Sequence, residues 1–311
     1  MVIKIDRKAI AYNINKAERI TRGVPVSIML KGFYDYLADI ECVNTRKLYS
    51  QSIPNSVCYA LHSAGSLHTG AVVADFDDFV ECYRDRGIKE FYIPFNALDD
   101  REGLDERRCK RLALRIRKAF DDVKLYMMIT SGCLNDKHPG LNHIEDKWRV
   151  WASAFFNGVS LGGSFYLSEL ESYISATERR VYCESGAVID VHLADPPRFI
   201  TDVRIGEYAL FGTIPFCNQK HLFGHNAITV ESEVIGVYPD RRQIVVRGGY
   251  SEIDTDKCTL LSGGLTFSDV SSEYTIYNDP FLRYKICDKV EVVPDYKSLV
   301  KLQYVAREYT E

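Results

Sequence analysis

Apolar residues near the start of the chain first alternate with polar ones and then switch to a helical spacing. Val2–Ile5 alternates as a strand does, and Asp6 is a residue type that caps helices. Ile10, Ile14 and Ala17 then recur three to four residues apart, which is the spacing of one helix face. The pattern predicts a short strand followed by an amphipathic helix of about 15 residues.

Short apolar runs rich in β-branched and aromatic residues then recur up to residue 205. The strands predicted from them are Val24–Leu30, Val57–Leu61, Ala71–Ala74, Glu90–Phe95, Val123–Ile129, Gly158–Leu161, Arg180–Cys183 and Ile200–Ile205. Helical patterns between them cover Asp75–Arg86, Asp105–Phe120, His143–Phe156 and Tyr166–Ser175. Strands that alternate with helices are typical of parallel β/α units, and about eight such strands close a barrel. Residues 1–222 are therefore predicted to form a (β/α)8 TIM-like barrel of the α/β class.

The pattern changes after Phe211-Gly212, where strands follow one another without helices. They are predicted at Ala227–Tyr238, Gln243–Gly248, Leu265–Ser268, Tyr274–Tyr277 and Lys289–Val293. Turn sequences such as Tyr238-Pro239-Asp240 and Ser262-Gly263-Gly264 separate them. Residues 223–311 are therefore predicted to form a C-terminal all-β domain.

Composition and charge exclude several kinds of partner. The formal net charge of the 311 residues is −4, and the basic side chains form no stripe or block, so we expect no nucleic-acid partner. The apolar runs are too short to span a membrane, and the N-terminus lacks the features of a secretory signal. The nine cysteines include no Cys-x-x-Cys pair. We expect a reduced, cytoplasmic protein without a metal site.

Lys31 ends the first strong apolar run of the predicted barrel and is followed by glycine. Active sites of such barrels are built at the carboxyl ends of the strands, so a lysine there belongs to the pocket. A neutral, buried lysine forms a Schiff base with an aldehyde cofactor. A lysine that simply ends a strand in solvent has the same sequence, and position alone leaves both interpretations open.

Two glycine-containing segments have the composition of phosphate sites. Leu161–Ser164 follows a predicted strand and precedes a helix, where backbone amides and the Ser164 hydroxyl suit a phosphate. Val203–Glu207 ends a late strand, and there Arg204 could reach a phosphate or a ring nitrogen. The structural alternatives are an ordinary Gly-Gly-Ser loop and an ion pair between Arg204 and Glu207.

Motifs at both ends of the chain and at the predicted domain junction occur in a recognisable order: Ile3–Asp6 with Asn13, the strand leading to Lys31, Val159–Tyr166, Asp202–Gly212, Asn226–Gly236, Gly249–Thr259 and Asp295–Tyr309. In this order they resemble the alanine racemase family, the barrel class of enzymes that use pyridoxal 5′-phosphate (PLP), and most of all its ornithine racemase branch. Residues 50–150 contribute only their alternation of strands and helices.

The resemblance implies a role for each matching residue. Lys31 would hold PLP as an internal aldimine, and Arg204 would face the pyridine nitrogen. The remaining cofactor-binding residues would be Tyr34, Ser164, Gly206, the amide of Glu207, and Tyr304. Tyr34 departs from the family pattern, because it lies one position short of the family's tyrosine.

Three functions remain open at this point. An arginine keeps the ring nitrogen unprotonated and suits racemisation, so Arg204 favours a PLP-dependent racemase whose substrate is a polar or cationic amino acid. A carboxylate suits decarboxylation, and Glu184 lies in Val181–Ala187, which is similar to the Glu-Pro-Gly-Arg segment of barrel-type PLP decarboxylases without its proline and arginine. The alternative is therefore a decarboxylase or another lyase of the same fold. The family's catalytic tyrosine is missing near residues 239–243, which leaves a non-catalytic PLP-binding homologue as the third function.

A racemase needs a proton donor on each face of its carbanion, and Lys31 serves only one face. The resemblance implies that the second donor comes from the β domain of a partner subunit, in a homodimer with shared active sites. Tyr250 is the first candidate, and Ser251 and His225 are the others. A packing aromatic at Tyr250 and a linker-lining His225 are the structural alternatives.

Overall fold

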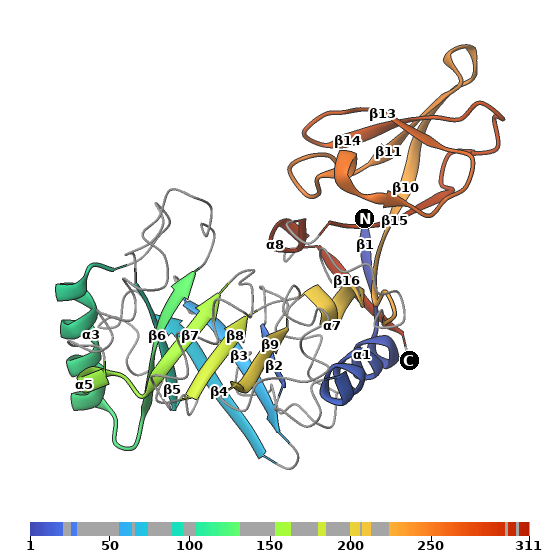
Figure 1. The fold of residues 1–311 in the computed structure, drawn as a ribbon. Helices are drawn as coiled ribbons and strands as arrows, with labels where there is room; N and C mark the ends of the chain where they lie inside the picture. Colours follow the sequence, from blue (N-terminus) through green and yellow to red (C-terminus); the bar gives the residue numbers. More distant parts are fainter. Residues whose placement is uncertain are drawn as a thin grey trace, which may run out of the picture.

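Eight strands close into a barrel in the computed structural model of the protein. The structure describes residues 1–20, 26–29, 56–63, 66–73, 89–95, 104–130, 153–162, 180–184, 200–205, 207–212, 224–295, 298–302 and 305–310. The barrel strands are β2 (Val26–Met29), β3 (Ser56–Ser63), β4 (Ser66–Val73), β5 (Glu90–Pro94), β6 (Lys124–Thr130), β7 (Gly158–Gly162), β8 (Arg180–Glu184) and β9 (Ile200–Ile205). Each pairs with the next in sequence, and β9 pairs with β2 (Figure 1).

Strand β3 is antiparallel to both of its neighbours, which differs from the all-parallel order expected from sequence. It pairs with β4 from Ser56↔Val73 to Ser63↔Ser66, so only two residues connect these strands. A parallel pair requires a crossover of a dozen residues or more, and two residues suffice only for a hairpin. All other described barrel pairings, including β9 with β2, are parallel.

Two long helices are described, and an aspartate caps the start of each: Asp6, which was predicted as a cap, and Asp105, the first residue of the predicted helical pattern. Helix α1 (Arg7–Ile20) starts where the Asp6 carboxylate accepts a hydrogen bond from the Ala9 amide at 2.9 Å. Helix α3 (Glu106–Ala119) starts where Asp105 accepts from the Arg108 amide at 2.8 Å.

Helix α3 covers the outer face of the barrel at β5. Its buried residues are Cys109, Leu112, Ala113 and Ile116. Phe91 of β5 contacts Phe120, at the end of the helix, with ring centroids 5.3 Å apart.

The other predicted helices are less fully described. Asp75–Arg86 and Tyr166–Ser175 lie outside the described residues, and only α5 (Ser153–Phe155) is described within His143–Phe156. A five-residue helix, α7 (Glu207–Phe211), follows β9 and packs against α1. No helix in the described ranges combines the length and the apolar character that a membrane span needs.

The C-terminal part is a β structure in which one long strand joins two layers. Its strands are β10 (Ile228–Tyr238), β11 (Gln243–Arg247), β12 (Thr259–Leu260), β13 (Thr266–Val270), β14 (Tyr274–Asn278), β15 (Lys289–Val293) and β16 (Ala306–Thr310). Short helices η6 (Pro239–Arg241), η7 (Thr255–Lys257) and α8 (Ser298–Leu302) lie between them. β10 pairs with β15 along its first half and with β11 along its second, and its register shifts between Val234 and Gly236. Such a bulge bends a strand, which lets β10 pass from one layer to the other.

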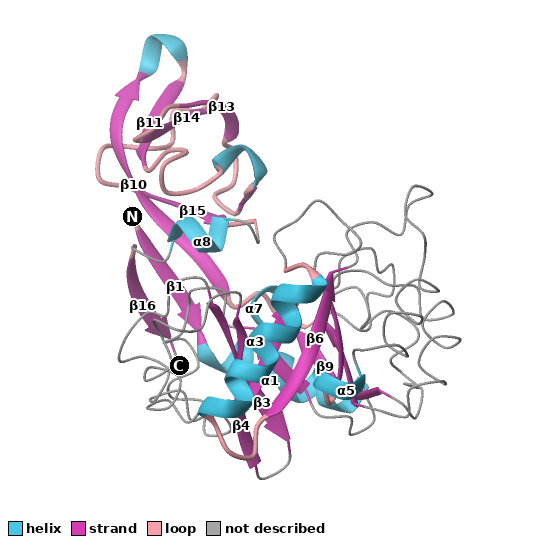
Figure 2. Ribbon diagram, turned by 90° about the vertical axis from the view of Figure 1, so that its left-hand side faces the viewer, coloured by secondary structure: helices cyan, strands magenta, loops and turns pink. Residues whose placement is uncertain are grey.

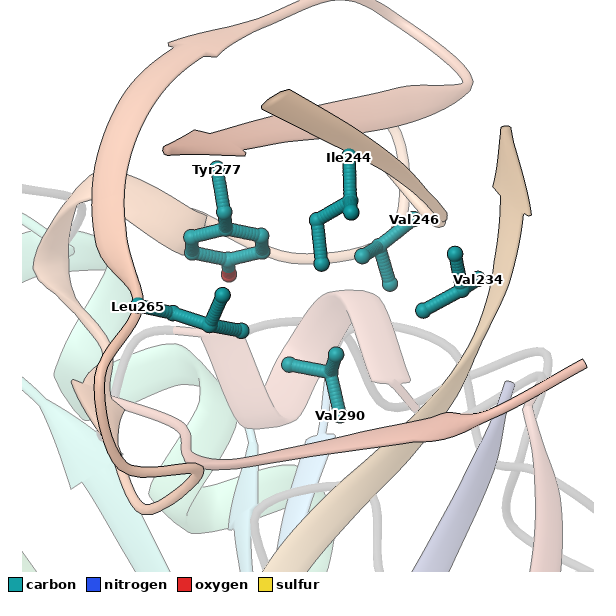
Figure 3. Close-up of a cluster of buried hydrophobic side chains, with 6 residues drawn as sticks. All are labelled: Val234, Ile244, Val246, Leu265, Tyr277 and Val290. Carbon is teal, nitrogen blue, oxygen red and sulfur yellow. The ribbon is translucent and has the colours of Figure 1, made fainter. Parts of the chain in front are cut away.

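Apolar side chains from both layers form the core of this β domain (Figure 3). Val234, Ile244, Val246 and Tyr277 come from the strands on one side, and Val290 comes from β15 on the other. Burial raises the pKa of Tyr277, so its phenol stays protonated inside the core. Along β10, β11, β14 and β15 the buried positions alternate mainly with half-buried ones.

The first strand of the chain belongs to this β structure and not to the barrel, which corrects its assignment to the barrel domain. β1 (Val2–Asp6) pairs antiparallel with β10 and parallel with β16, a strand that was not predicted from the sequence. Ile3 and Ile5 are fully buried there. Alternation predicted that β1 is a half-buried strand, but periodicity carries no information about which sheet a strand joins.

Candidate active site

The strand order brings together the chain segments that contain most of the predicted cofactor residues. β7, β8, β9 and β2 are consecutive around the barrel and parallel, so their carboxyl ends lie at one edge. Arg204 is in β9, and Glu207 begins the helix after it. Ser164 follows the end of β7 by two residues, and Lys31 follows the end of β2 by two residues. Lys31, Tyr34, Ser164, Gly206 and Tyr304 themselves lie outside the described residues.

Arg204 and Glu184, the two candidates for a partner of a ring nitrogen, occupy one register level. Glu184 of β8 pairs with Arg204 of β9, and Arg204 pairs in turn with Ser27 of β2. On its other side Glu184 pairs with Gly162 of β7. The backbone therefore places the two candidates directly opposite each other on neighbouring strands.

A polar group inside the barrel at β5 and β6 was not predicted from the sequence. Tyr92 and Tyr126 are fully buried and stacked, with ring centroids 5.2 Å apart. The Tyr92 hydroxyl donates to the buried Glu90 carboxylate at 3.0 Å, and Lys124 lies 3.7 Å from its other oxygen. Since Phe91 faces α3, the alternate residues Glu90 and Tyr92 face the interior. Glu90 and Lys124 begin their strands, so this group lies at the end of the barrel opposite the carboxyl edge.

Tyr250 lies in a turn whose backbone is fixed on two sides. Its amide donates to the Ser271 carbonyl at 2.9 Å, and its carbonyl accepts from the Lys301 ammonium group of α8 at 2.9 Å. The side chain remains 55% exposed. An exposed aromatic ring on a fixed backbone is suited to contact a second molecule.

Gly249 is required for this turn because the chain approaches the 271–273 segment closely. A Cβ atom at Gly249 would lie 2.1 Å from the Ser271 carbonyl oxygen and 2.7 Å from the Glu273 nitrogen. The Gly249 amide also donates to the Glu252 carboxylate at 3.1 Å, and the Ser251 hydroxyl donates to the same carboxylate at 2.9 Å. Ser251 is thereby engaged within the turn.

His225 lies at the junction between the barrel and the β domain. Its ring packs against Tyr12 of α1, with centroids 4.4 Å apart, in an open groove that Asp6, Lys8 and Asn226 also line. Its backbone amide and carbonyl are both bonded to the Asn13 side chain, each at 2.7 Å. These contacts make the segment around His225 part of the junction.

Two further observations limit the chemistry of the described residues. Burial, with a smaller contribution from Tyr12, raises the pKa of Tyr208 in α7, so that phenol is poorly suited to exchange protons near neutral pH. Within the described ranges, no three His, Cys, Asp or Glu side chains are grouped so that they could hold a metal ion.

Comparison with known proteins identifies the fold. No protein-family model matches the sequence, and no curated protein matches it either. Among solved structures, D-threo-3-hydroxyaspartate dehydratase from Delftia sp. HT23 aligns over 99% of this chain and 93% of its own, with 13% identity and a TM-score of 0.62.

Two other neighbours have different activities in their names. Biosynthetic alanine racemase from Pseudomonas aeruginosa aligns over 100% of this chain and 99% of its own, with 15% identity and a TM-score of 0.57. D-threonine aldolase from Filomicrobium marinum aligns over 97% and 89%, with 12% identity and a TM-score of 0.53. At these identities the likeness establishes that this chain has the fold of alanine racemase-type proteins. It does not distinguish a racemase from a dehydratase or an aldolase.

Proposed function

We propose that this chain is a PLP-dependent amino acid racemase that uses Lys31 as its cofactor lysine. The observation that carries the proposal is the strand order β7-β8-β9-β2, which gathers the ends of the segments that contain Ser164, Arg204, Glu207 and Lys31. The resemblance of these segments to the alanine racemase family and the shared fold support it independently of each other.

The chemistry of these residues fits PLP. The cofactor requires an amine for its aldehyde, donors for its phosphate and a partner for its ring nitrogen. Lys31 supplies the amine, and Arg204 supplies the partner for the ring nitrogen. The phosphate donors are the Ser164 hydroxyl, the backbone amides at Gly206 and Glu207, and Tyr304. The resemblance also makes Tyr34 a cofactor-binding residue. When bound, PLP withdraws electrons from the α-carbon of an amino acid and makes its α-hydrogen acidic.

Lys31 then moves a proton on one face of the substrate, and Tyr250 moves one on the other. We prefer Tyr250 to His225 because its ring is exposed on a fixed turn, whereas the ring of His225 packs on Tyr12. In this proposal Tyr250 reaches the site of a partner subunit, so the protein is a homodimer with shared active sites. The substrate is a polar or cationic amino acid, as in the ornithine racemase branch, and the enzyme acts in the cytoplasm.

We also propose a division of the chain into a (β/α)8-type barrel ending near residue 222 and a β domain from residue 223. The β domain includes β1 in addition to residues 223–311, since β1 pairs with β10 and β16.

The pairing of Glu184 with Arg204 favours a second candidate function. If Glu184 rather than Arg204 sets the charge of the ring nitrogen, the nitrogen stays protonated and the site suits decarboxylation or another lyase reaction. The names of the structural neighbours include a dehydratase and an aldolase, so the fold is compatible with lyase chemistry.

Absorption spectroscopy and a D₂O incubation test the proposal together. The purified chain with excess PLP should show the visible absorption of lysine-bound cofactor, and Lys31→Ala should abolish it. Lys118→Ala, which changes an exposed lysine of α3, should leave it unchanged. In D₂O the substrate should exchange its α-hydrogen and lose optical purity.

Three outcomes would contradict this proposal in different ways. A colourless wild type would refute cofactor binding. Release of CO₂ without racemisation would assign the decarboxylase function and promote Glu184. A coloured protein without turnover of any amino acid tested would leave the non-catalytic PLP-binding homologue.

A further inference from the structure

The turn that carries Tyr250 is attached to α8 by a network of charged and polar side chains. Lys301 of α8 donates to the Tyr250 carbonyl at 2.9 Å and forms an ion pair with Asp254. The Asp254 amide donates to the Ser298 hydroxyl at 3.1 Å, and that hydroxyl donates to the Asp295 carboxylate. Ser298 is fully buried at the start of α8. The network therefore connects a solvent-facing turn to a buried helix end.

The Tyr250 amide and the Tyr250 carbonyl are held by different parts of the β domain, and Lys301 holds the carbonyl. Ser271 accepts from the Tyr250 amide, and the close approach at Gly249 fixes the preceding residue. The Tyr250 carbonyl points instead to α8, where Lys301 is its donor. Both ribbon views place α8 below β11, β13 and β14, on the side of the barrel (Figures 1 and 2).

We propose that Lys301 is a positioning residue for Tyr250, which it holds in place through the Tyr250 carbonyl and the ion pair with Asp254. The inference rests on the proposed function, in which Tyr250 moves a proton on the second face of the substrate. Because the tyrosine side chain is long, a small rotation of its backbone displaces the phenol hydroxyl by a larger distance. A displacement of about 1 Å at a reacting group lowers a rate by about 100-fold.

The competing explanation is an ordinary surface ion pair. Lys301 and Asp254 are partly exposed, with side-chain exposures of 35% and 22%, and pairs of that kind contribute about 0–1 kcal/mol to stability. A stability measurement therefore does not separate the two roles, whereas a measurement that distinguishes the two faces of the substrate does.

The experiment compares Lys301→Met with Lys301→Arg and with a matched control. The control is Lys110→Met, because Lys110 is 32% exposed and pairs with Glu106 on α3 at 2.8 Å, away from the turn. For each variant, two rates are measured in D₂O: racemisation, and α-hydrogen exchange with retention of configuration for each enantiomer. Backbone hydrogen exchange of residues 248–252 is measured without cofactor.

In Lys301→Met we expect racemisation to fall about tenfold or more, because proton transfer on the Tyr250 face becomes slow. Exchange with retention on the Lys31 face should change by less than about twofold, since that face keeps its base. Backbone exchange in the turn should accelerate. The visible absorption of lysine-bound PLP should stay unchanged, Lys301→Arg should recover most of the activity, and Lys110→Met should behave as wild type.

Two results would overturn the inference alone. In the first, the racemisation rate and the α-hydrogen exchange rates on both faces fall equally, as general damage to the site would cause. The other is unchanged backbone exchange in the turn together with unchanged racemisation. A wild type that neither binds PLP nor racemises would overturn the proposed function itself, and the two failures are thereby distinguishable.

Discussion

The Asn13 side chain joins parts of the chain that lie about 200 residues apart in sequence. It lies on the buried face of α1, and its side-chain amide donates to the carbonyls of Ala209 and His225 at 3.1 and 2.7 Å. Its side-chain oxygen accepts from the His225 amide at 2.7 Å. One side chain thus holds α1, α7 and the entry to the β domain together.

Asn13→Ala should destabilise the protein markedly, because it leaves buried backbone groups without partners. Loss of these bonds should cost about 3 kcal/mol, which lowers the melting temperature by about 6 °C. The control is Asn226→Ala, which removes a more exposed asparagine with a single bond, to Ile228, and should cost within about 0.5 kcal/mol. Thermal unfolding of both variants provides the measurement. Equal melting temperatures would refute the structural role of Asn13.

A sequence signal for this role existed. Asn13 occupies a position of the helical repeat between Ile10 and Ala17, where the pattern requires an apolar residue. A polar side chain on the buried face of a helix needs hydrogen-bond partners. The identity of those partners depends on residues about 200 positions away, which no local pattern encodes.

At the scale of elements, α3 contains a buried thiol that links its packing to pH. Desolvation, more than the nearby Asp105 and Glu106 carboxylates, raises the pKa of Cys109 from 9.0 to about 12. Between these values the unfolded chain has lost the thiol proton while the folded chain keeps it. The folded state binds more protons in this range, so its stability falls as pH rises from about 9 to about 12.

Removing the thiol should weaken this dependence. Between pH 7.5 and pH 10.5, wild type should lose about 2 kcal/mol more of its free energy of unfolding than Cys109→Ala does. Urea titrations at both pH values measure the difference. Parallel losses in the two proteins would mean that the Cys109 thiol ionises in the folded state as easily as in the unfolded one.

Most described helices and strands could be predicted from the sequence, whereas the way the strands pair could not. The cap at Asp6, the bounds of α3, and strands such as β5, β6 and β14 lie within a residue or two of the prediction. The antiparallel direction of β3 and the pairing of β1 with β16 were not predictable, since alternation defines which face is buried but neither direction nor partner. β16 itself was missed because its burial alternates only between half-buried and exposed positions.

At the scale of the whole molecule, the roles of the candidate site residues were inferred mainly from the resemblance to a known family. The strand ends of β2, β7 and β9 were predictable as a common edge from the barrel pattern. The network of Lys301, Asp254 and Ser298 around Tyr250 was not, because α8 is too short for its periodicity to be detected. The candidate cofactor residues thus have local sequence signals, whereas the residues that hold the turn of Tyr250 do not.

Shared active sites can be tested by mixing two inactive variants, Lys31→Ala and Tyr250→Phe. In a dimer whose sites combine Lys31 of one subunit with Tyr250 of the other, random exchange gives half mixed dimers with one intact site each. The mixture should recover up to about a quarter of wild-type racemisation. Proven subunit exchange without recovery would mean that both residues serve one subunit's site, or that Tyr250 has no part in catalysis.

The position of β1 between β10 and β16 has a consequence for synthesis of the protein on the ribosome. β1 leaves the exit tunnel before either of its neighbours, which are residues 228–231 and 306–310. Until β10 emerges, Ile3 and Ile5 belong to a strand with two open edges, and one edge stays open until β16 emerges. Chaperones bind such segments, and they aggregate when left uncovered. The nascent barrel can therefore begin to form while β1 still lacks both of its neighbouring strands.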